Sequence, residues 1–132
     1  MKLHNRNLWD EMTRGKESIG KEDCPFCEND DLLTIWKGKY LHIKHNKYPY
    51  NGLNDHLLLI PYRHIEHTKE LNKEELIEIQ KAEKFFSDYY QDKDYFSLIR
   101  QTNAGKSIKH IHYHYIPGKL YSSELENILK NN

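Results

Sequence analysis

Three histidines occupy every second position of residues 110–114, and isoleucine and tyrosine fill the positions between them and the two that follow, 115 and 116. A β-strand turns successive side chains to opposite faces, so a strand here would place the three imidazoles together and apolar groups behind them. Buried imidazole nitrogens need polar partners, which makes such a face a poor core. Imidazole also serves as nucleophile, acid, base or metal ligand near neutral pH. The alternation therefore predicts a chemical site at His110, His112 and His114.

The spacing of these histidines fits two chemistries. Alternate residues on one strand face lie about 6.5–7 Å apart, which lets two of them share a metal ion in a hydrolytic zinc site. Alternatively, one imidazole attacks the substrate while its neighbours orient it and stabilise its charge. The periodicity alone leaves both alternatives open.

The two cysteines lie three positions apart, at Cys24 and Cys27. In a reducing compartment this spacing is more typical of a metal knuckle or a redox pair than of a structural disulfide. A redox pair is expected between a strand and a helix of a thioredoxin-like unit, and the surrounding sequence lacks that pattern. A four-ligand zinc site needs two further ligands, and the chain has nine histidines to supply them.

The composition favours one polar domain without a broad electrostatic field. The chain has 132 residues, with 20 basic and 20 acidic side chains, and a mean hydropathy of −0.95. This balance gives no reason to expect binding to nucleic acid or acidic membranes. No apolar run is long enough to span a membrane, and the polar N-terminus is unlike a signal peptide. We therefore expect a cytoplasmic protein whose thin core is helped by dimerisation.

Hydrophobic periodicity predicts the elements that must position these groups. Asn72 and Glu75 form a capping-box pattern at the start of a long helix. Apolar and aromatic residues then recur at helical spacing from Leu76 to Tyr90, and lysines and glutamates form the solvated side. A second, short helix is expected over residues 122–130, with Ile128 turned inward. Five strands are expected over residues 32–36, 40–45, 56–60, 95–100 and 110–116.

These elements predict an α+β domain built on an antiparallel sheet. The domain should cover residues 24–132, after a polar lead-in over residues 1–23.

The histidine run closely resembles the His-φ-His-φ-His-φ-φ signature, with φ apolar, of the histidine triad family of nucleotide hydrolases and transferases. Other segments resemble the family in the same order. The two cysteines resemble its N-terminal zinc knuckle, and residues 46–51 resemble a segment of the diadenosine tetraphosphate phosphorylase and hydrolase branch. Residues 55–61 resemble its upstream histidine strand, and residues 64–71 the segment that follows it. The likeness covers residues 24–118.

This resemblance implies a fold and a set of catalytic residues. It implies a five-stranded antiparallel sheet with one long helix, and a homodimer in which two sheets join into ten strands. His112 matches the nucleophile that attacks the α-phosphorus and forms a covalent nucleotidyl-imidazole. His114 lies beside the phosphates, His56 braces the cluster, and His110 completes the catalytic set. The residues assigned to the nucleotide are Asn46 at the ribose, Ser107 at the phosphate, and Lys106 and Asn103 in the preceding loop.

The resemblance also implies a structural zinc ion rather than a catalytic one. Cys24, Cys27, His64 and His110 match a closed Cys₂His₂ set, which has no open position for a metal-bound water. His67 is the rival to His64. No organic cofactor is expected, although magnesium can accompany the substrate phosphates.

Two departures from the family pattern bear on the reaction. Lys106 stands where many members have a glutamine that assists the leaving group, and Asp55 stands where glycine usually precedes the upstream histidine. The expected activity is hydrolysis of dinucleoside polyphosphates such as diadenosine tetraphosphate. The alternatives are a phosphorylase or nucleoside phosphoramidase that uses the same site, or a nucleotide-binding module with negligible turnover.

Overall fold

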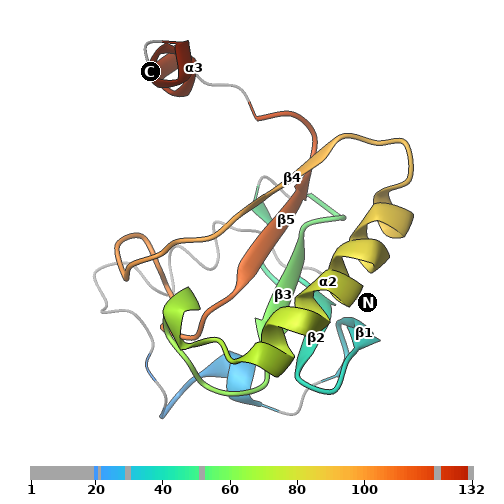
Figure 1. Ribbon diagram of the computed structural model, residues 1–132, viewed down its shortest axis with the longest axis vertical. Helices are drawn as coiled ribbons and strands as arrows, with labels where there is room; N and C mark the ends of the chain where they lie inside the picture. Colours follow the sequence, from blue (N-terminus) through green and yellow to red (C-terminus); the bar gives the residue numbers. More distant parts are fainter. Residues whose placement is uncertain (1–19, 21, 29–30, 51–52, 121–122, 131–132) are drawn as a thin grey trace.

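One five-stranded sheet organises the chain. The computed structural model describes residues 20, 22–28, 31–50, 53–120 and 123–130, and its strands pair antiparallel in the order β1-β2-β3-β5-β4. The strands are β1 (Thr34–Lys37), β2 (Leu41–His45), β3 (Leu57–Pro61), β4 (Tyr95–Leu98) and β5 (Tyr113–Pro117). The helices are α2 (Lys73–Tyr90) and α3 (Ser123–Lys130), with short 3₁₀ turns η1 (Pro25–Cys27) and η3 (Thr68–Glu70). The predicted α+β fold is confirmed (Figure 1).

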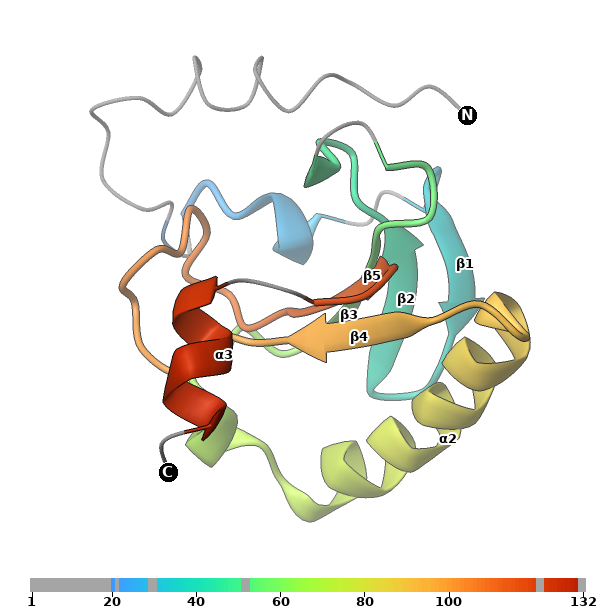
Figure 2. The ribbon, with the colours of Figure 1, turned by 90° about the horizontal axis from the view of Figure 1, so that it is seen from above.

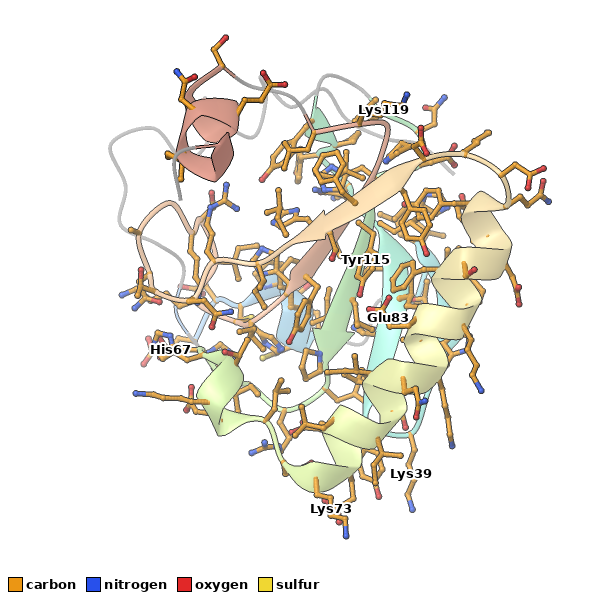
Figure 3. All side chains as sticks on the ribbon, turned by 45° about the horizontal axis from the view of Figure 1, so that its top comes forward. Lys39, His67, Lys73, Glu83, Tyr115 and Lys119 are labelled. Atoms are coloured by element: carbon orange, nitrogen blue, oxygen red, sulfur yellow. The ribbon has the colours of Figure 1, made fainter. Side chains whose placement is uncertain are left out.

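The long helix α2 covers one face of the sheet and forms the core with it. Phe86 of α2 stacks on Tyr115 of β5 with ring centroids 3.5 Å apart, and the Tyr115 hydroxyl donates to Glu83 of the same helix (Figure 3). Burial of such large apolar groups supplies most of the stabilisation of a small domain. The buried core consists of Leu41, Ile43, Leu57, Leu59, Ala82, Phe86, Tyr90 and Tyr115.

The start of α2 is as predicted, but its buried stripe is not. Asn72 accepts from the backbone of Glu75, and the Glu75 side chain accepts from the backbone of Asn72. Leu76, expected on the buried side, is 56% exposed, whereas Glu78 is 6% exposed. The Glu78 carboxylate accepts from three backbone N–H groups of residues 39–41, after the β1–β2 turn, so hydrogen bonding makes its burial favourable.

The opposite face of the sheet carries the polar residues. Lys44, Leu58 and His114 lie directly across from one another on β2, β3 and β5, and Leu98 of β4 extends this row. Residues opposite each other in an antiparallel sheet point to the same side. Figure 2 shows α2 and η1 on opposite sides of the sheet, so the N-terminal turn lies over this polar face.

Two local predictions are corrected by the structure. Strand β5 begins at Tyr113, so His110 and His112 precede the strand instead of belonging to it. The amide of Ile111 donates to the Ile65 carbonyl, 2.7 Å away, in a loop, which takes this segment out of the ladder. The C-terminal helix is present, but Ile128 is 60% exposed instead of inward.

The predicted lead-in over residues 1–23 lies almost wholly outside the described residues. Within the described part of the chain, no helix combines the length and apolar character needed to cross a membrane.

Candidate active site and metal centre

A pocket lies on the polar face of the sheet, with a volume of about 140 Å³. Its walls come from η1, the end of β2, the loops after β2 and β4, and the segment before β5. Two of the three histidines of the run, His112 and His114, line it, while His110 does not. The other lining residues that the sequence assigns to a nucleotide are Asn46, Lys106 and Ser107. The structure therefore brings together the central residues of the predicted site.

The hydrogen bond of His112 fixes its tautomer. Nδ1 of His112 lies 2.7 Å from the carbonyl oxygen of His110. A carbonyl only accepts, so Nδ1 carries the proton and donates. In the neutral ring this leaves the lone pair on Nε2, the nitrogen that a nucleophilic imidazole uses.

A second chain of hydrogen bonds fixes His56 and His114. The backbone N–H of Tyr50 donates to Nδ1 of His56 at 3.2 Å, so His56 carries its proton on Nε2. That nitrogen lies 2.9 Å from Nδ1 of His114 and donates to it. Because Nδ1 of His114 accepts this bond, the single N–H of the neutral His114 ring is on Nε2. Both rings are nearly fully buried, and a single backbone amide sets the tautomer of both.

The residues predicted to bind the nucleotide differ in their position relative to the pocket. The Asn46 side chain is 8% exposed, accepts from the Tyr48 amide at 2.9 Å, and lies 3.4 Å from Nε2 of His56. Ser107 lines the pocket beside Lys106, which is 7% exposed. Asn103 is exposed and is not a lining residue; its carbonyl accepts from the Lys106 amide at 3.1 Å.

The four predicted metal ligands form a cluster beside the pocket. Nδ1 of His110 lies 3.4 Å from Sγ of Cys24 and 3.5 Å from Sγ of Cys27. Nδ1 of His64 lies 3.1 Å from Sγ of Cys27 and 3.2 Å from Nδ1 of His110. Tetrahedral zinc with ordinary Zn–S and Zn–N bonds places its ligand atoms about 3.3–3.8 Å apart. The four contacts, at 3.1–3.5 Å, are near these separations, and all four candidate ligand atoms lie within 4.8 Å of one another, so the cluster has about the size that such an ion requires.

Hydrogen bonding and burial favour this cluster as a metal site. Nε2 of His110 donates to the Pro61 carbonyl at 2.7 Å, which leaves Nδ1 unprotonated toward the cysteines, as a metal ligand must be. Burial lowers the pKa of His110 to about 4, so the ring is neutral near pH 7. Burial and the neighbouring Cys27 thiol raise the pKa of Cys24 to about 11. Metal binding would offset the free-energy cost of deprotonating this thiol. His67, the rival ligand, instead lies with its Nδ1 3.2 Å from the Gln101 carbonyl.

Two residues connect the Cys/His cluster to the pocket. His110 contributes a ring nitrogen to the cluster, and its carbonyl accepts from His112. Phe26, between the two cysteines, lines the pocket and packs edge-on against the His112 ring, with centroids 5.0 Å apart. The knuckle is therefore one wall of the site, a role that the cysteine spacing did not predict for Phe26.

Asp55 is turned away from the pocket. Its carboxylate accepts from the Tyr89 hydroxyl of α2 at 2.7 Å, and its carbonyl accepts from the Tyr90 hydroxyl at 2.7 Å. This departure from the family pattern thus anchors the start of β3 to the helix and keeps a negative charge off the lining.

Sequence reasoning missed two residues of this face, Arg100 and His42. Arg100 lines the pocket. Tyr50 also lines it, and the Tyr50 ring stacks on His114 with centroids 5.4 Å apart. His42 is 5% exposed and packs against Tyr62. The alternation in β2 was the available signal, because it places His42 and Lys44 on the same side of the sheet.

A five-stranded antiparallel sheet whose buried histidines face a pocket beside a Cys/His cluster defines a histidine triad protein. The HIT domain family model matches residues 29–120, and the chain belongs to this family. AP-4-A phosphorylase of Mycobacterium tuberculosis, found in two strains, is 29% identical over 101 residues, which are 72% of this chain and 51% of the relative. The chain spans about half the length of these curated relatives.

Solved structures agree with this assignment. The diadenosine triphosphate hydrolase of Plasmodium falciparum in complex with cyclomarin A has a TM-score of 0.61 and 25% identity, over 96% of this chain and 90% of that one. A HIT family hydrolase from Legionella pneumophila has a TM-score of 0.61 and 21% identity, over 76% and 97% of the two chains. A zinc-bound histidine triad family protein from Mycobacterium smegmatis has a TM-score of 0.61 and 17% identity, over 77% and 79%. The last two matches establish the fold alone.

Proposed function

We propose that this chain cleaves dinucleoside polyphosphates, such as diadenosine tetraphosphate, at the α-phosphorus through a covalent nucleotidyl-His112. The observation that carries the proposal is the 2.7 Å bond from Nδ1 of His112 to the His110 carbonyl. It leaves the Nε2 lone pair of a pocket-lining histidine available for attack. The matches to an AP-4-A phosphorylase and a diadenosine triphosphate hydrolase support this class of substrate.

In the first step, Nε2 of His112 attacks the α-phosphorus and a nitrogen–phosphorus bond forms. The bond from phosphorus to the α–β bridging oxygen breaks, and the remaining polyphosphate leaves with that electron pair. The ring becomes positively charged, and its Nδ1–H bond to the His110 carbonyl stabilises this charge. The Nε2–H of His114 donates to a non-bridging α-phosphate oxygen as negative charge accumulates there.

In the second step, water attacks the same phosphorus and the nitrogen–phosphorus bond breaks. The products are the nucleoside monophosphate and a proton, and His112 returns to its neutral tautomer. Inorganic phosphate in place of water would give a nucleoside diphosphate and make the chain a phosphorylase. Ammonia as the group displaced in the first step would make it a phosphoramidase.

Three of the remaining predicted residues line the pocket: Asn46, assigned to the ribose, and Ser107 and Lys106, assigned to the phosphates and leaving group. Asn103, the fourth residue assigned to the nucleotide, lies in the loop outside this lining. Asn46 and His56 are adjacent in the structure, so ribose binding and bracing of the histidine pair involve one buried cluster. Magnesium bound to the substrate phosphates remains compatible with these assignments.

We assign zinc to the cluster of Cys24, Cys27, His64 and His110, because two thiolates and two imidazoles are its usual tetrahedral set. Zinc, when bound, would hold the knuckle against His110 and so support the carbonyl that orients His112. All four positions are taken by protein atoms, which argues for a structural role.

We also propose a homodimer. Strands β1 and β4 are the two edges of the described sheet, and pairing of β4 with a second copy would give one ten-stranded sheet. Light scattering of the purified chain tests this proposal, and a monomeric mass at working concentration would reject it.

The activity is tested by incubating the purified, zinc-loaded chain with diadenosine tetraphosphate, with and without inorganic phosphate, and separating the products. AMP and ATP identify a hydrolase, whereas ADP and ATP formed only with phosphate identify a phosphorylase. His112→Asn should abolish turnover and the labelling of the protein by nucleotide that an alkaline denaturing quench traps, because acid hydrolyses a phosphorus–nitrogen bond to histidine. Stoichiometric nucleotide binding without products would instead favour the binding module.

A further inference from the structure

The pocket concentrates positive charge in a chain whose total charge is balanced. The chain has 20 basic and 20 acidic residues, yet the charged residues of the lining are four cations and one carboxylate. These are Lys44, Lys47, Arg100, Lys106 and Glu28. A concave site lined by one sign of charge attracts ligands of the opposite sign. The pocket therefore favours a ligand with several negative charges.

Arg100 lies beside the histidine pair. It follows Leu98, which is directly opposite His114 in the sheet. Its Nη1 donates to the Tyr50 hydroxyl at 3.5 Å, and the Tyr50 ring stacks on His114. One aromatic ring thus connects the guanidinium to the histidine that we place at the α-phosphate.

The loop after β4 is shaped around the Arg100 side chain. Gly105 has a φ of +78°, and a Cβ there would lie 2.9 Å from Nε of Arg100. A glycine meets both the positive φ and the close approach without strain. In the part of the chain that the structure describes, no carboxylate forms an ion pair with Arg100, so its charge is not neutralised from within the lining.

Lys106 is engaged differently. It occupies the position at which the family resemblance places the leaving-group glutamine, but its Nζ donates to the Glu66 carbonyl at 2.5 Å, and Glu66 is not a lining residue. Arginine also suits phosphate better, because its planar group donates two parallel hydrogen bonds while lysine acts as a point charge.

From these observations we propose that Arg100 binds the phosphates of the leaving group and makes the site selective for substrates whose leaving group is itself a polyphosphate. The inference rests on the proposed function and deepens it. When the α–β bridging bond breaks, the electron pair passes to an oxygen of the departing polyphosphate, and Arg100 donates hydrogen bonds to this anion. A substrate that loses a group without phosphate gains nothing from Arg100.

The test compares two substrates with the same AMP part. Diadenosine tetraphosphate has a polyphosphate leaving group, whereas adenosine 5′-phosphoramidate loses ammonia. We expect Arg100→Gln to lower the ratio of their kcat/KM values, tetraphosphate over phosphoramidate, by about tenfold or more. Arg100→Lys should restore part of the ratio. Gly105→Ala should lower the same ratio, because it displaces the guanidinium without removing its charge.

Lys81→Gln is the matched control, because Lys81 is an exposed cation of α2 on the other face of the sheet. It should leave the ratio at the wild-type value. An equal fall of both kcat/KM values in Arg100→Gln, or the same fall in Lys81→Gln, would overturn the proposal.

A binding measurement separates this inference from the proposed function. Calorimetric titration with inorganic tripolyphosphate should show binding about tenfold weaker in Arg100→Gln than in the wild type, and unchanged binding in Lys81→Gln. If the wild type turns over neither nucleotide, the proposed function fails and the titration alone decides the role of Arg100. Equal affinities of wild type and Arg100→Gln for tripolyphosphate would refute the inference, with the melting temperature confirming that the variant is folded.

Discussion

The hydroxyl of Tyr90 links the start of β3, next to His56, to β5, which carries His114. It donates to the Asp55 carbonyl at 2.7 Å and to the Tyr115 carbonyl at 3.1 Å, and Tyr90 is 2% exposed. Asp55 precedes His56 and Tyr115 follows His114, so one hydroxyl holds the backbone next to each partner of the histidine hydrogen bond. Burial raises the pKa of Tyr90, which keeps the hydroxyl a donor at any working pH. We predict that Tyr90→Phe weakens both the fold and the site.

The expected size of the effect follows from the two carbonyl groups, of Asp55 and Tyr115, to which the hydroxyl donates. Tyr90→Phe removes one donor that two carbonyls share and leaves the ring in place, so no large cavity forms. Loss of the bond and the unsatisfied acceptor together should lower the free energy of unfolding by about 2 kcal/mol. Misalignment of His56 and His114 should reduce kcat by roughly tenfold, equivalent to about 1.4 kcal/mol in the barrier. KM should change less, because these histidines act on the phosphate that is being transferred.

Tyr89→Phe is the matched control for this prediction. The Tyr89 hydroxyl donates to the Asp55 carboxylate at 2.7 Å, and both side chains are only partly buried, so water can replace the bond. The expected loss is about 0.5 kcal/mol. Urea unfolding followed by tryptophan fluorescence, together with steady-state kinetics, measures both variants. If Tyr90→Phe costs no more than Tyr89→Phe in stability and in kcat, the strand-bridging role of Tyr90 is wrong.

Three further predictions concern the metal centre and the polar face. Chelation of zinc, or Cys27→Ser, should lower the melting temperature as bound zinc per chain falls; an unchanged melting temperature in metal-free protein would contradict a structural role. Phe26→Ala should lower kcat/KM while zinc content stays at the wild-type level, because the ring contacts His112 without being a ligand. Loss of zinc in this variant would contradict this, because Phe26 would then act through the metal site and not through its contact with His112. Burial lowers the pKa of His42 from 6.5 to about 4, so its neutral form stabilises the fold above pH 6.5 and that stabilisation is lost as the pH falls toward 4. Unfolding curves should show that about 3 kcal/mol of the stability present above pH 6.5 is lost at pH 4, and His42→Leu should remove this part of the pH dependence; identical pH dependence in both proteins would refute it.

Local patterns predicted the elements well because their causes are local. The capping box at Asn72 and Glu75 forms as the sequence indicates, and the turn at Gly38 joins β1 to β2 with a hydrogen bond from the Gly38 amide to the Leu41 carbonyl. The metal cluster was accessible only through the family resemblance, since nothing in the spacing of Cys24 and Cys27 selects two ligands from nine histidines.

The parts that the sequence did not reveal depend on partners distant in the chain. Periodicity assigns glutamates to the solvent, yet Glu75 is buried against Arg63 and Glu78 against backbone amides at least 37 residues away. The placement of Arg100 depends likewise on Tyr50 and Gly105, one of which lies 50 residues earlier. Such pairings cannot be predicted before the fold is known, because the hydrogen bonds that make the burial of a charge favourable come from other helices, strands and loops.

The tautomers of the pocket histidines are determined by backbone groups more than by neighbouring side chains. The Tyr50 amide fixes His56 and thereby His114, and the His110 carbonyl fixes His112. A side-chain carboxylate in either position would hold the ring as firmly but would also add a negative charge where we propose that the phosphates bind. Backbone groups orient the imidazoles without that charge, so the positive lining remains available for the substrate. The carboxylate adjacent to His56, that of Asp55, agrees with this arrangement, because it points toward α2 and accepts from the Tyr89 hydroxyl.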